Sequence, residues 1–310
     1  MKLINPSFEI LDQQCGLEGI YKQIEVIGRT CYKSEDKITE DSAKGFVDRM
    51  IKSGHGAMLE HGTVYLEFHV KDPSIVGEEE YHNQQGFLNK LINKYVGNKY
   101  SIVKVNHYYD TAFITTNYRV LVENNWLDDL KYLCEPTSFH EKRICVKFIC
   151  DRGVSHEFVR HRVFSFAQES TRYCNYSKDK FNNEITYICP YWLDYNKVQE
   201  LTEIANKDNK EVYRMGHDES LSMEERGLCS FVYDMSNHEH GYLFQISAGW
   251  KPQEARAVLP NALKTELIMT GFVSDWEHFF ELRDAVSAHP QAQELVHPLH
   301  EAFIQRGLVK

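Results

Sequence analysis

The sequence predicts a globular protein that combines β-strands with α-helices, and three observations lead to this expectation. The chain of 310 residues, 42% of them hydrophobic and 13% aromatic, is long and apolar enough to bury a large core. Its N-terminal half contains segments with the alternating pattern of strands, whereas apolar residues in its C-terminal half recur at helical spacing. Because no internal repeat or proline-rich linker divides the chain, a single domain spanning residues 1–310 is the simplest interpretation.

The clearest strand candidates are Val64–Val70 and Ile144–Cys150, in which β-branched and aromatic residues alternate with other types. Ile102–Val105 and Ala112–Val120 are two further candidates. Between the first and third of these, Glu78–Tyr95 is polar but carries leucines and an isoleucine at helical spacing, so a helix is expected there.

Two other helices are expected from local signals. Asn124–Leu133 resembles a short helix in composition. Pro290 is placed to open the last helix of the chain, and Pro298 is expected to kink it because proline cannot donate the internal backbone hydrogen bond.

The segment from Ser274 to Glu277 has the S-x-x-E form of a capping box, which predicts a helix over about 275–285. On such a helix, Arg283 lies on the same face as three large apolar residues, because the spacings are three, four and seven. These residues are Trp276, Phe279 and Phe280. Arg283 is therefore expected to be partly removed from water.

Composition and charge exclude several classes of protein. The formal charge of −10 disfavours nonspecific binding to nucleic acid, which needs a positive field, so an anionic ligand would have to meet a local cluster of arginines. No segment approaches the length of apolar sequence that a membrane span requires, and Glu9 and Asp12 stand where a signal peptide would be apolar. A cytoplasmic protein that does not bind membranes is expected.

The cysteines and histidines do not predict a metal site. The eight cysteines are scattered without a CxxC pair and are expected to be reduced thiols. His156 and His161 are five residues apart, whereas a zincin helix places its two histidines four apart on one face.

Familiar backbone cradles for phosphate are absent, since there is no P-loop, no GxGxxG after a strand and no G-x-S-x-G elbow. A phosphate site would therefore use side chains. The densest candidate is Arg160–Tyr173, with three arginines, two serines and a threonine. A solvated basic surface is the alternative, but interleaved Phe and Val residues favour arginine heads that converge beside an apolar wall.

Within this segment, Arg160-His161-Arg162 followed after seven residues by Ser170 resembles the RHRx7S signature of the flavin-dependent thymidylate synthases, the ThyX family. Four more ordered blocks resemble the same family, and they are Gly28–Tyr32, His55–His61, Pro252–Pro260 and Phe280–Arg283 with Ala288–Gln291. The five blocks are distributed along most of the chain. Residues 71–142 separate blocks that are closer together in compact members, which indicates an inserted segment of unassigned function.

The resemblance implies an α+β fold with a central antiparallel sheet flanked by helices, assembled as a homotetramer with active sites at subunit interfaces. It implies reductive methylation of dUMP to dTMP, with methylenetetrahydrofolate as carbon source, FAD as hydride carrier and NADPH as reductant. The site must then bind two phosphorylated ligands and place the flavin ring in an apolar slot.

The resemblance implies a role for each residue that matches one of the family's motifs. The FAD-binding set comprises Cys31, His55, Glu60, Arg160, His161, Arg162, Phe272, Ser274, His278 and His289. The dUMP-binding set comprises Glu157, Arg160, Gln168, Glu169, Ser170, Thr171, Arg172, Arg256 and Arg283. Departures from compact members occur at Glu157 and Gln168, where those members often carry Gln and Glu, and at Phe272 and Ser274, where they can use Asn and Arg for the flavin.

The resemblance implies that Arg283 is catalytic, pairing with the uracil ring and stabilising its N3-ionised form. A structural ion pair with Asp284 or Glu281 is the alternative, which the helical spacing disfavours because neighbours one and two residues away do not face each other. No protein nucleophile is expected, although Cys174 and Ser170 lie close in sequence to Arg172.

Two other functions remain open at this point. One is a FAD-dependent NADPH oxidase or reductase, which would use the same flavin site without dUMP. The other is a noncatalytic nucleotide-binding or RNA-binding module, which the net charge disfavours.

Overall fold

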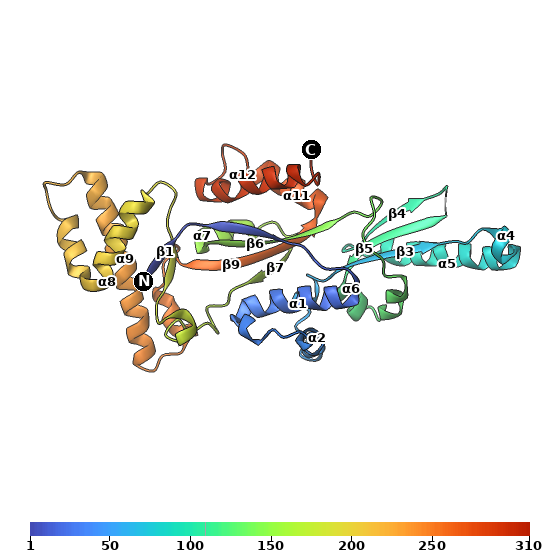
Figure 1. The fold of residues 1–310 in the computed structure, drawn as a ribbon, viewed down its shortest axis with the longest axis horizontal. Coiled ribbons are helices and arrows are strands. Elements are labelled where there is room, and N and C mark those ends of the chain that lie inside the picture. Colours follow the sequence, from blue (N-terminus) through green and yellow to red (C-terminus); the bar gives the residue numbers. More distant parts are fainter. Residues whose placement is uncertain (109) are drawn as a thin grey trace.

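The computed structural model describes residues 1–108 and 110–310 and shows an elongated molecule with a sheet and its helices at the centre (Figure 1). The described strands form a four-stranded, a three-stranded and a two-stranded sheet. One end of the molecule is a pair of long helices, and the other is the small sheet with a long helix beside it (Figure 1).

The central sheet has the order β2-β6-β9-β7, and all its neighbouring strands are antiparallel. Its strands are β2 (Ser7–Leu11), β6 (Arg143–Asp151), β7 (Ser165–Gln168) and β9 (Lys264–Phe272). Successive side chains of β6 point to opposite faces, which is the strand periodicity. Val146 and Phe148 pack into one core and Cys145 into another, so each face of the sheet is covered.

Helices from opposite ends of the chain cover the two faces (Figure 1). On one face lie α7 (Arg152–Phe158), α11 (Val273–Arg283) and α12 (Pro290–Gln305), packed around Phe148 and Trp276. On the other face, α1 (Gly16–Tyr32) packs Ile27 against the sheet.

The three-stranded sheet is antiparallel and has the order β3-β5-β4. It consists of β3 (Thr63–His69), β4 (Ile102–Asn106) and β5 (Thr111–Asn117), with α4 (Pro73–Val76), α5 (Glu78–Val96) and α6 (Tyr118–Glu123) around it. Most of it belongs to the segment 71–142 expected to be an insert. Leu91 and Ile114 of this segment share a core with Ile20 and Ile24 of α1, so the segment packs directly on the rest of the chain.

The helical end consists of α8 (Tyr195–Gly216) and α9 (Met223–Ser247), packed beside the parallel pair β1 (Lys2–Ile4) and β8 (Thr186–Ile188). A capping box between Ser222 and Glu225 starts α9. The remaining short elements are α2 (Ser42–Lys52), α3 (Gly56–Leu59), α10 (Pro252–Ala255), η1 (Glu35–Lys37), η2 (Leu127–Tyr132), η3 (Asp179–Phe181) and η4 (Arg256–Val258).

The structure confirms antiparallel sheets flanked by helices, and it confirms the strands expected at 64–70, 102–105 and 144–150 and the helix expected at 78–95. The strand expected at 112–120 is wrong at its end, because the Asn117 side chain accepts from the backbone N–H of Val120 and starts α6. No helix in the described part of the chain has the length and apolar character to cross a membrane.

One expected helix is wrong, and the helix expected over about 275–285 is confirmed as α11 with its ends shifted by two residues. Asn124–Leu133 forms only a 3₁₀ segment over Leu127–Tyr132. The expected capping box at Ser274 is also displaced, since α11 begins at Val273 and Asp275 accepts from the backbone N–H of Phe272 at 3.0 Å. The Asp275 carboxylate, one turn into the helix, caps it two residues earlier than the serine pattern indicates.

Candidate active site

A turn between α7 and β7 presents the Arg160-His161-Arg162 motif. Asp151 caps α7 by accepting from the backbone N–H of Val154 at 2.7 Å. After α7 ends, the buried side chains of Phe158, His161 and Phe164 anchor the turn, while Arg160 and Arg162 are exposed. Of the apolar residues interleaved with the arginines, Phe158 and Phe164 are buried, whereas Val159 and Val163 are exposed.

Arg283 lies at the end of α11 and reaches this turn. Its Nη1 donates to Oε2 of Glu157 at 2.6 Å, and its Nη2 donates to the Glu157 carbonyl at 3.0 Å. Its Nε donates to Nε2 of His161 at 3.0 Å. The structure therefore joins the C-terminal block to the central motif through three hydrogen bonds from one guanidinium.

The surroundings of Arg283 confirm its predicted partial burial, since Trp276, Phe279 and Phe280 on the same helix are fully or almost fully buried. Its neighbours in sequence do not pair with it: Asp284 bonds His297 and His300 instead. The alternative of a local ion pair is therefore wrong, and Glu157 replaces it as the partner.

His161 is held as a neutral imidazole. Burial, followed by the positive charge of Arg283 and the neighbouring His278, lowers the pKa of His161 to about 4. An uncharged ring accepts the hydrogen bond from Arg283 at Nε2 and carries its own proton on Nδ1. The ring thus orients the arginine without adding a second positive charge at neutral pH.

The segment after β7 collects several of the residues expected to bind dUMP. Arg256 of η4 donates from Nη1 to the Thr171 hydroxyl at 3.0 Å, although the two are far apart in sequence. The Ser170 hydroxyl accepts from the backbone N–H of Arg172 at 3.4 Å, and the Ser170 N–H donates to the Cys31 carbonyl at 3.0 Å. One guanidinium, that of Arg256, thus meets the segment that carries the two hydroxyls, and a phosphate site uses such donors.

Gln168 and Glu169 are engaged by other side chains. Gln168 donates to the hydroxyls of Ser155 and Thr265, at 2.9 and 3.2 Å. The buried carboxylate of Glu169 pairs with Lys264 at 2.8 Å. In this structure both side chains fix the position of the segment that carries Ser170 to Arg172 through these contacts.

Of the residues expected to bind FAD, three share one cavity. Glu60, Arg162 and Phe272 line a space of about 510 Å³ next to β6 and β9. Glu60 forms an ion pair with Arg119 at 2.5 Å on one side of it. Arg143, which the sequence analysis did not single out, also lines this space.

The other expected FAD residues are dispersed. Cys31 is buried, and burial raises the pKa of its thiol to about 11. His278 is exposed and pairs with Glu281 at 3.3 Å, while Ser274 is exposed on the first turn of α11. His55 and His289 are exposed N-cap residues, and in the described residues no hydrogen bond or ion pair joins them to the motif arginines.

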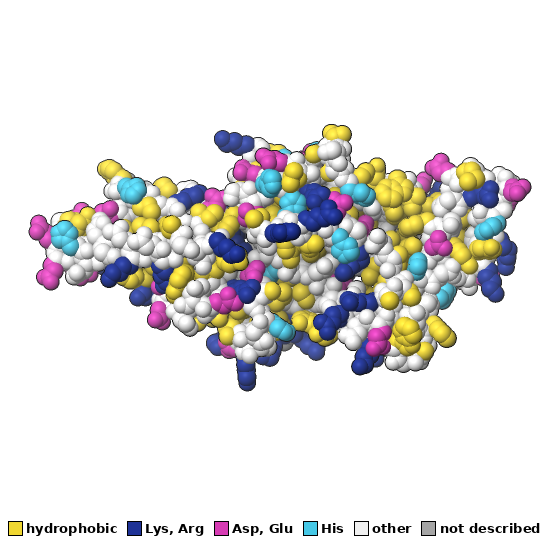
Figure 2. Space-filling view, turned by 180° about the vertical axis from the view of Figure 1, so that it is seen from behind, with side chains coloured by type: hydrophobic (Ala, Val, Ile, Leu, Met, Phe, Trp, Pro, Cys, Tyr) yellow, Lys and Arg dark blue, Asp and Glu magenta, His cyan; other side chains and the backbone are white. Residues whose placement is uncertain are grey.

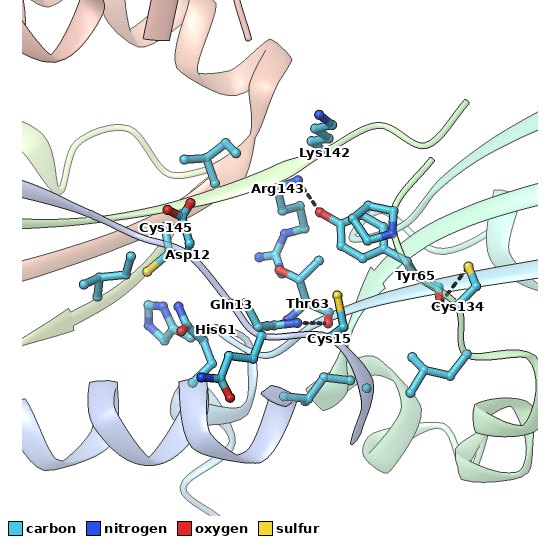
Figure 3. Close-up of a pocket in the computed structure, with 18 of the residues that line it drawn as sticks. Asp12, Gln13, Cys15, His61, Thr63, Tyr65, Cys134, Lys142, Arg143 and Cys145 are labelled. Atoms are coloured by element: carbon cyan, nitrogen blue, oxygen red, sulfur yellow. Dashed lines mark hydrogen bonds between the residues drawn. The ribbon is translucent and has the colours of Figure 1, made fainter. Parts of the chain in front are cut away.

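A second cavity, of about 310 Å³, is also lined by Arg143 (Figure 3). Some of its polar groups are paired with each other: Gln13 donates to the Thr63 carbonyl at 2.8 Å, and the Arg143 backbone N–H donates to the Tyr65 hydroxyl at 3.1 Å. His61 is buried there and hydrogen-bonds the Thr270 hydroxyl at 2.8 Å. Burial and the Arg143 charge lower the pKa of His61 to about 3.

The charge of the surface is unevenly distributed. Figure 2 shows Lys and Arg side chains gathered with histidines near the middle of one face, although the chain as a whole is acidic. A local positive field attracts anionic ligands despite a negative net charge.

The eight cysteines are free thiols, and burial is the main cause that raises the pKa of each. None therefore has the lowered pKa of an activated nucleophile. In residues 1–108 and 110–310 no cluster of three or more His, Cys, Asp or Glu side chains is arranged to hold a metal ion.

The fold and this site define a protein with antiparallel sheets flanked by helices, in which Arg283 of α11 contacts the turn that carries the arginine motif. The family model described as "Thymidylate synthase complementing protein" matches residues 110–306, which is more than half of the chain. The chain belongs to this family.

Curated relatives are similar to this chain over part of their length. A flavin-dependent thymidylate synthase of Pyrococcus furiosus is 28% identical over 161 residues, which are 52% of this chain and 54% of that protein. Proteins of the same name from Corynebacterium efficiens and Mycobacterium avium are 32% and 29% identical, over 43% and 46% of this chain and 45% and 50% of their own lengths. The chain thus spans about half the length of the curated relatives that it matches.

Proposed function

We propose that this protein catalyses the FAD-dependent reductive methylation of dUMP to dTMP, with methylenetetrahydrofolate as carbon donor and NADPH as reductant. The observation that carries the proposal is the contact of Arg283 with both Glu157 and His161, which unites two blocks of the family resemblance in one cluster. Family membership supports the same reaction class.

The described residues fit the flavin nucleotide. Beside Arg162 and Phe272, the cavity contains the buried guanidinium of Arg143, which has no carboxylate partner in the described residues, so the site suits an anionic ligand with an aromatic part. Arg160 and His161 belong to the same turn as Arg162. When bound, FAD would supply a carrier for hydride.

For dUMP, we assign phosphate binding to Arg172, Arg256, Ser170 and Thr171, whose contacts are described above. Gln168 and Glu169 would position this segment, since both are braced by neighbouring side chains. Arg283 would face the uracil. Its partly buried position weakens screening by water, which strengthens its attraction for an ionised N3.

Glu157 and His161 would orient Arg283 before dUMP arrives. The Glu157 carboxylate and carbonyl hold two of its nitrogens, and the neutral imidazole holds the third. Preorganised charge of this kind stabilises a transition state without the cost of reorientation.

The proposal includes the homotetramer with interfacial active sites, the cytoplasmic location and the single domain with an inserted segment. The rival activities are separated by experiment. Absorbance of the purified protein reports bound flavin, and tritium release from labelled dUMP reports the methylation. A FAD-dependent NADPH oxidase or reductase would oxidise its flavin at a rate that does not depend on dUMP. A noncatalytic module would neither oxidise a flavin nor release tritium from dUMP.

Flavin retention is expected to depend on the geometry of the motif arginines. Arg160→Lys and Arg162→Lys keep the charge but lose the planar fork that bridges two phosphate oxygens. Both variants should lose FAD on gel filtration, measured by the flavin absorbance of the protein peak. Full retention by both would contradict this assignment, and Arg214→Lys, an exposed arginine on α8, is the control.

Neither Cys174 nor Ser170 is expected to act as a nucleophile. Cys174 is fully buried, and burial raises the pKa of its thiol to about 12, so the thiolate is scarce at neutral pH. Cys174→Ala and Ser170→Ala should each retain measurable dTMP formation, with Ser170→Ala mainly weakening dUMP affinity because one hydrogen bond is removed. Complete loss of product while FAD and dUMP remain bound would instead indicate covalent catalysis.

A further inference from the structure

Arg143 is a buried arginine that forms no ion pair with any of the residues that the structure describes. Its side chain is 9% exposed, and its Nη1 donates to the Glu60 carbonyl at 3.0 Å and to the Thr63 hydroxyl at 3.4 Å. Its Nη2 donates to the Ser165 hydroxyl at 3.4 Å. In the described residues no carboxylate forms an ion pair with it, and burial lowers the pKa of its guanidinium.

The positive charge of the Arg143 guanidinium and some of its N–H donors therefore lack partners among the described residues. A guanidinium has five N–H donors, and the three bonds above go to neutral acceptors. A buried cation without a counter-ion is costly, whereas an anion that enters beside it gains from the low local dielectric. The remaining donors therefore favour an anionic ligand.

The cavity next to Arg143 contains two further cations. Arg162 comes from the central motif, and Lys99 comes from the loop between α5 and β4, within the segment 71–142. The Lys99 ammonium lies over the Tyr100 ring, 4.8 Å from its centre, and its side chain is exposed. Three positive groups from separate parts of the chain thus border one space of about 510 Å³.

The two carboxylates of this cavity already have partners. Glu60 is paired with Arg119 at 2.5 Å. Asp275 accepts from the backbone N–H of Phe272 at 3.0 Å, as the cap of α11. Neither of them forms an ion pair with Arg143 in the described residues, and three cations border the cavity against these two carboxylates.

We propose that Arg143 and Lys99, together with Arg162, bind a phosphoryl group of the flavin nucleotide, so that the inserted segment contributes directly to the cofactor site. This inference rests on the proposed function. An arginine fork matches phosphoryl oxygens, and a lysine adds a mobile point charge. Phe272, whose ring lies 5.5 Å from the Arg143 guanidinium, supplies an aromatic surface beside them.

The test compares the affinities of FAD and riboflavin, measured by fluorescence titration of the flavin-free protein. Riboflavin lacks the phosphoryl groups. Arg143→Met should weaken FAD binding by about tenfold or more and leave riboflavin binding unchanged, as expected for the loss of a charged hydrogen bond. Lys99→Ala should weaken FAD binding by about threefold, in line with an exposed charge. Lys90→Ala, an exposed lysine of α5 outside the cavity, is the matched control.

Equal weakening of FAD and riboflavin by Arg143→Met would assign Arg143 a structural role and overturn the inference. If Arg143→Met does not fold, the Lys99→Ala variant, which changes an exposed residue, tests the inference. An unchanged affinity of Lys99→Ala for FAD would overturn it. If the wild-type protein binds FAD and forms dTMP, and both variants also bind FAD normally, only this inference is overturned. A wild-type protein without affinity for FAD removes the proposed function and this inference with it.

Discussion

Arg283→Ala is expected to lower turnover at saturating dUMP by about a hundredfold or more, the usual effect of losing one preorganised charge stabiliser. Its guanidinium is partly buried and held by Glu157 and His161, so water cannot replace it efficiently. Steady-state kinetics over a range of dUMP concentrations separates this effect from weakened binding, because loss of uniform binding raises only the Michaelis constant.

A matched control is Arg214→Ala, which removes an exposed arginine of α8 that is remote from the cluster and should leave the kinetics unchanged. Glu157→Gln adds a second comparison, since the amide keeps an acceptor for Arg283 but loses the charge that holds it. It should lower turnover less than Arg283→Ala does. An Arg283→Ala variant with normal turnover and weakened dUMP affinity would make Arg283 a binding residue instead.

Glu266→Gln is expected to lower the free energy of unfolding at pH 7 by about 3 kcal/mol, as when one partner of a buried ionic cluster is removed. Glu266 is 5% exposed. Its carboxylate contacts the ammonium groups of Lys33 and Lys264, each at 2.6 Å, and of Lys147 at 2.7 Å. Without it, three clustered cations lose their shared counter-ion.

The loss of unfolding free energy in Glu266→Gln should depend on pH. Although burial opposes ionisation, the charges of Lys264 and Lys33 and the hydrogen bond from Lys147 hold the pKa of Glu266 well below its ordinary value of 4.5. A lowered folded-state pKa contributes stability above pH 4.5 that is lost as the pH falls toward the folded-state value. The difference between wild type and Glu266→Gln in urea unfolding should therefore shrink below pH 4.5.

The control is Glu281→Gln, an exposed carboxylate on α11, which should change stability little. A difference between wild type and Glu266→Gln that stays constant from pH 7 to well below pH 4.5 would show that the ionised carboxylate does not hold the lysine cluster together.

Local periodicity was sufficient to predict several elements. The β-branched alternation of Val64–Val70 and Ile144–Cys150 marks strands that the structure confirms. The long helix α9 was missed, although Ser222 and Glu225 form a capping box that the S-x-x-E pattern could have revealed. The same pattern failed at Ser274, where Asp275 captures the backbone N–H of Phe272 instead.

The candidate site was only partly predictable. The motif arginines are adjacent in sequence, and the helical spacing of Trp276, Phe279 and Arg283 is enough to predict that Arg283 is partly buried. Arg143 was missed because one arginine at the start of a strand carries no sequence signal. Its significance comes from burial without an ion pair in the described residues and from the cavity that it shares with Lys99.

The sequence by itself determined the local elements and the face on which Arg283 lies, because the 3.6-residue and 2-residue periods depend only on neighbours in the chain. Only the tertiary structure decided that Arg283 pairs with Glu157 rather than with Asp284, that Arg256 reaches Thr171, and that Lys99 borders the same cavity as Arg162. The physical reason is that an ion pair or a cavity requires distant segments to meet, and the packing of α11 and the inserted segment around the central sheet brings them together.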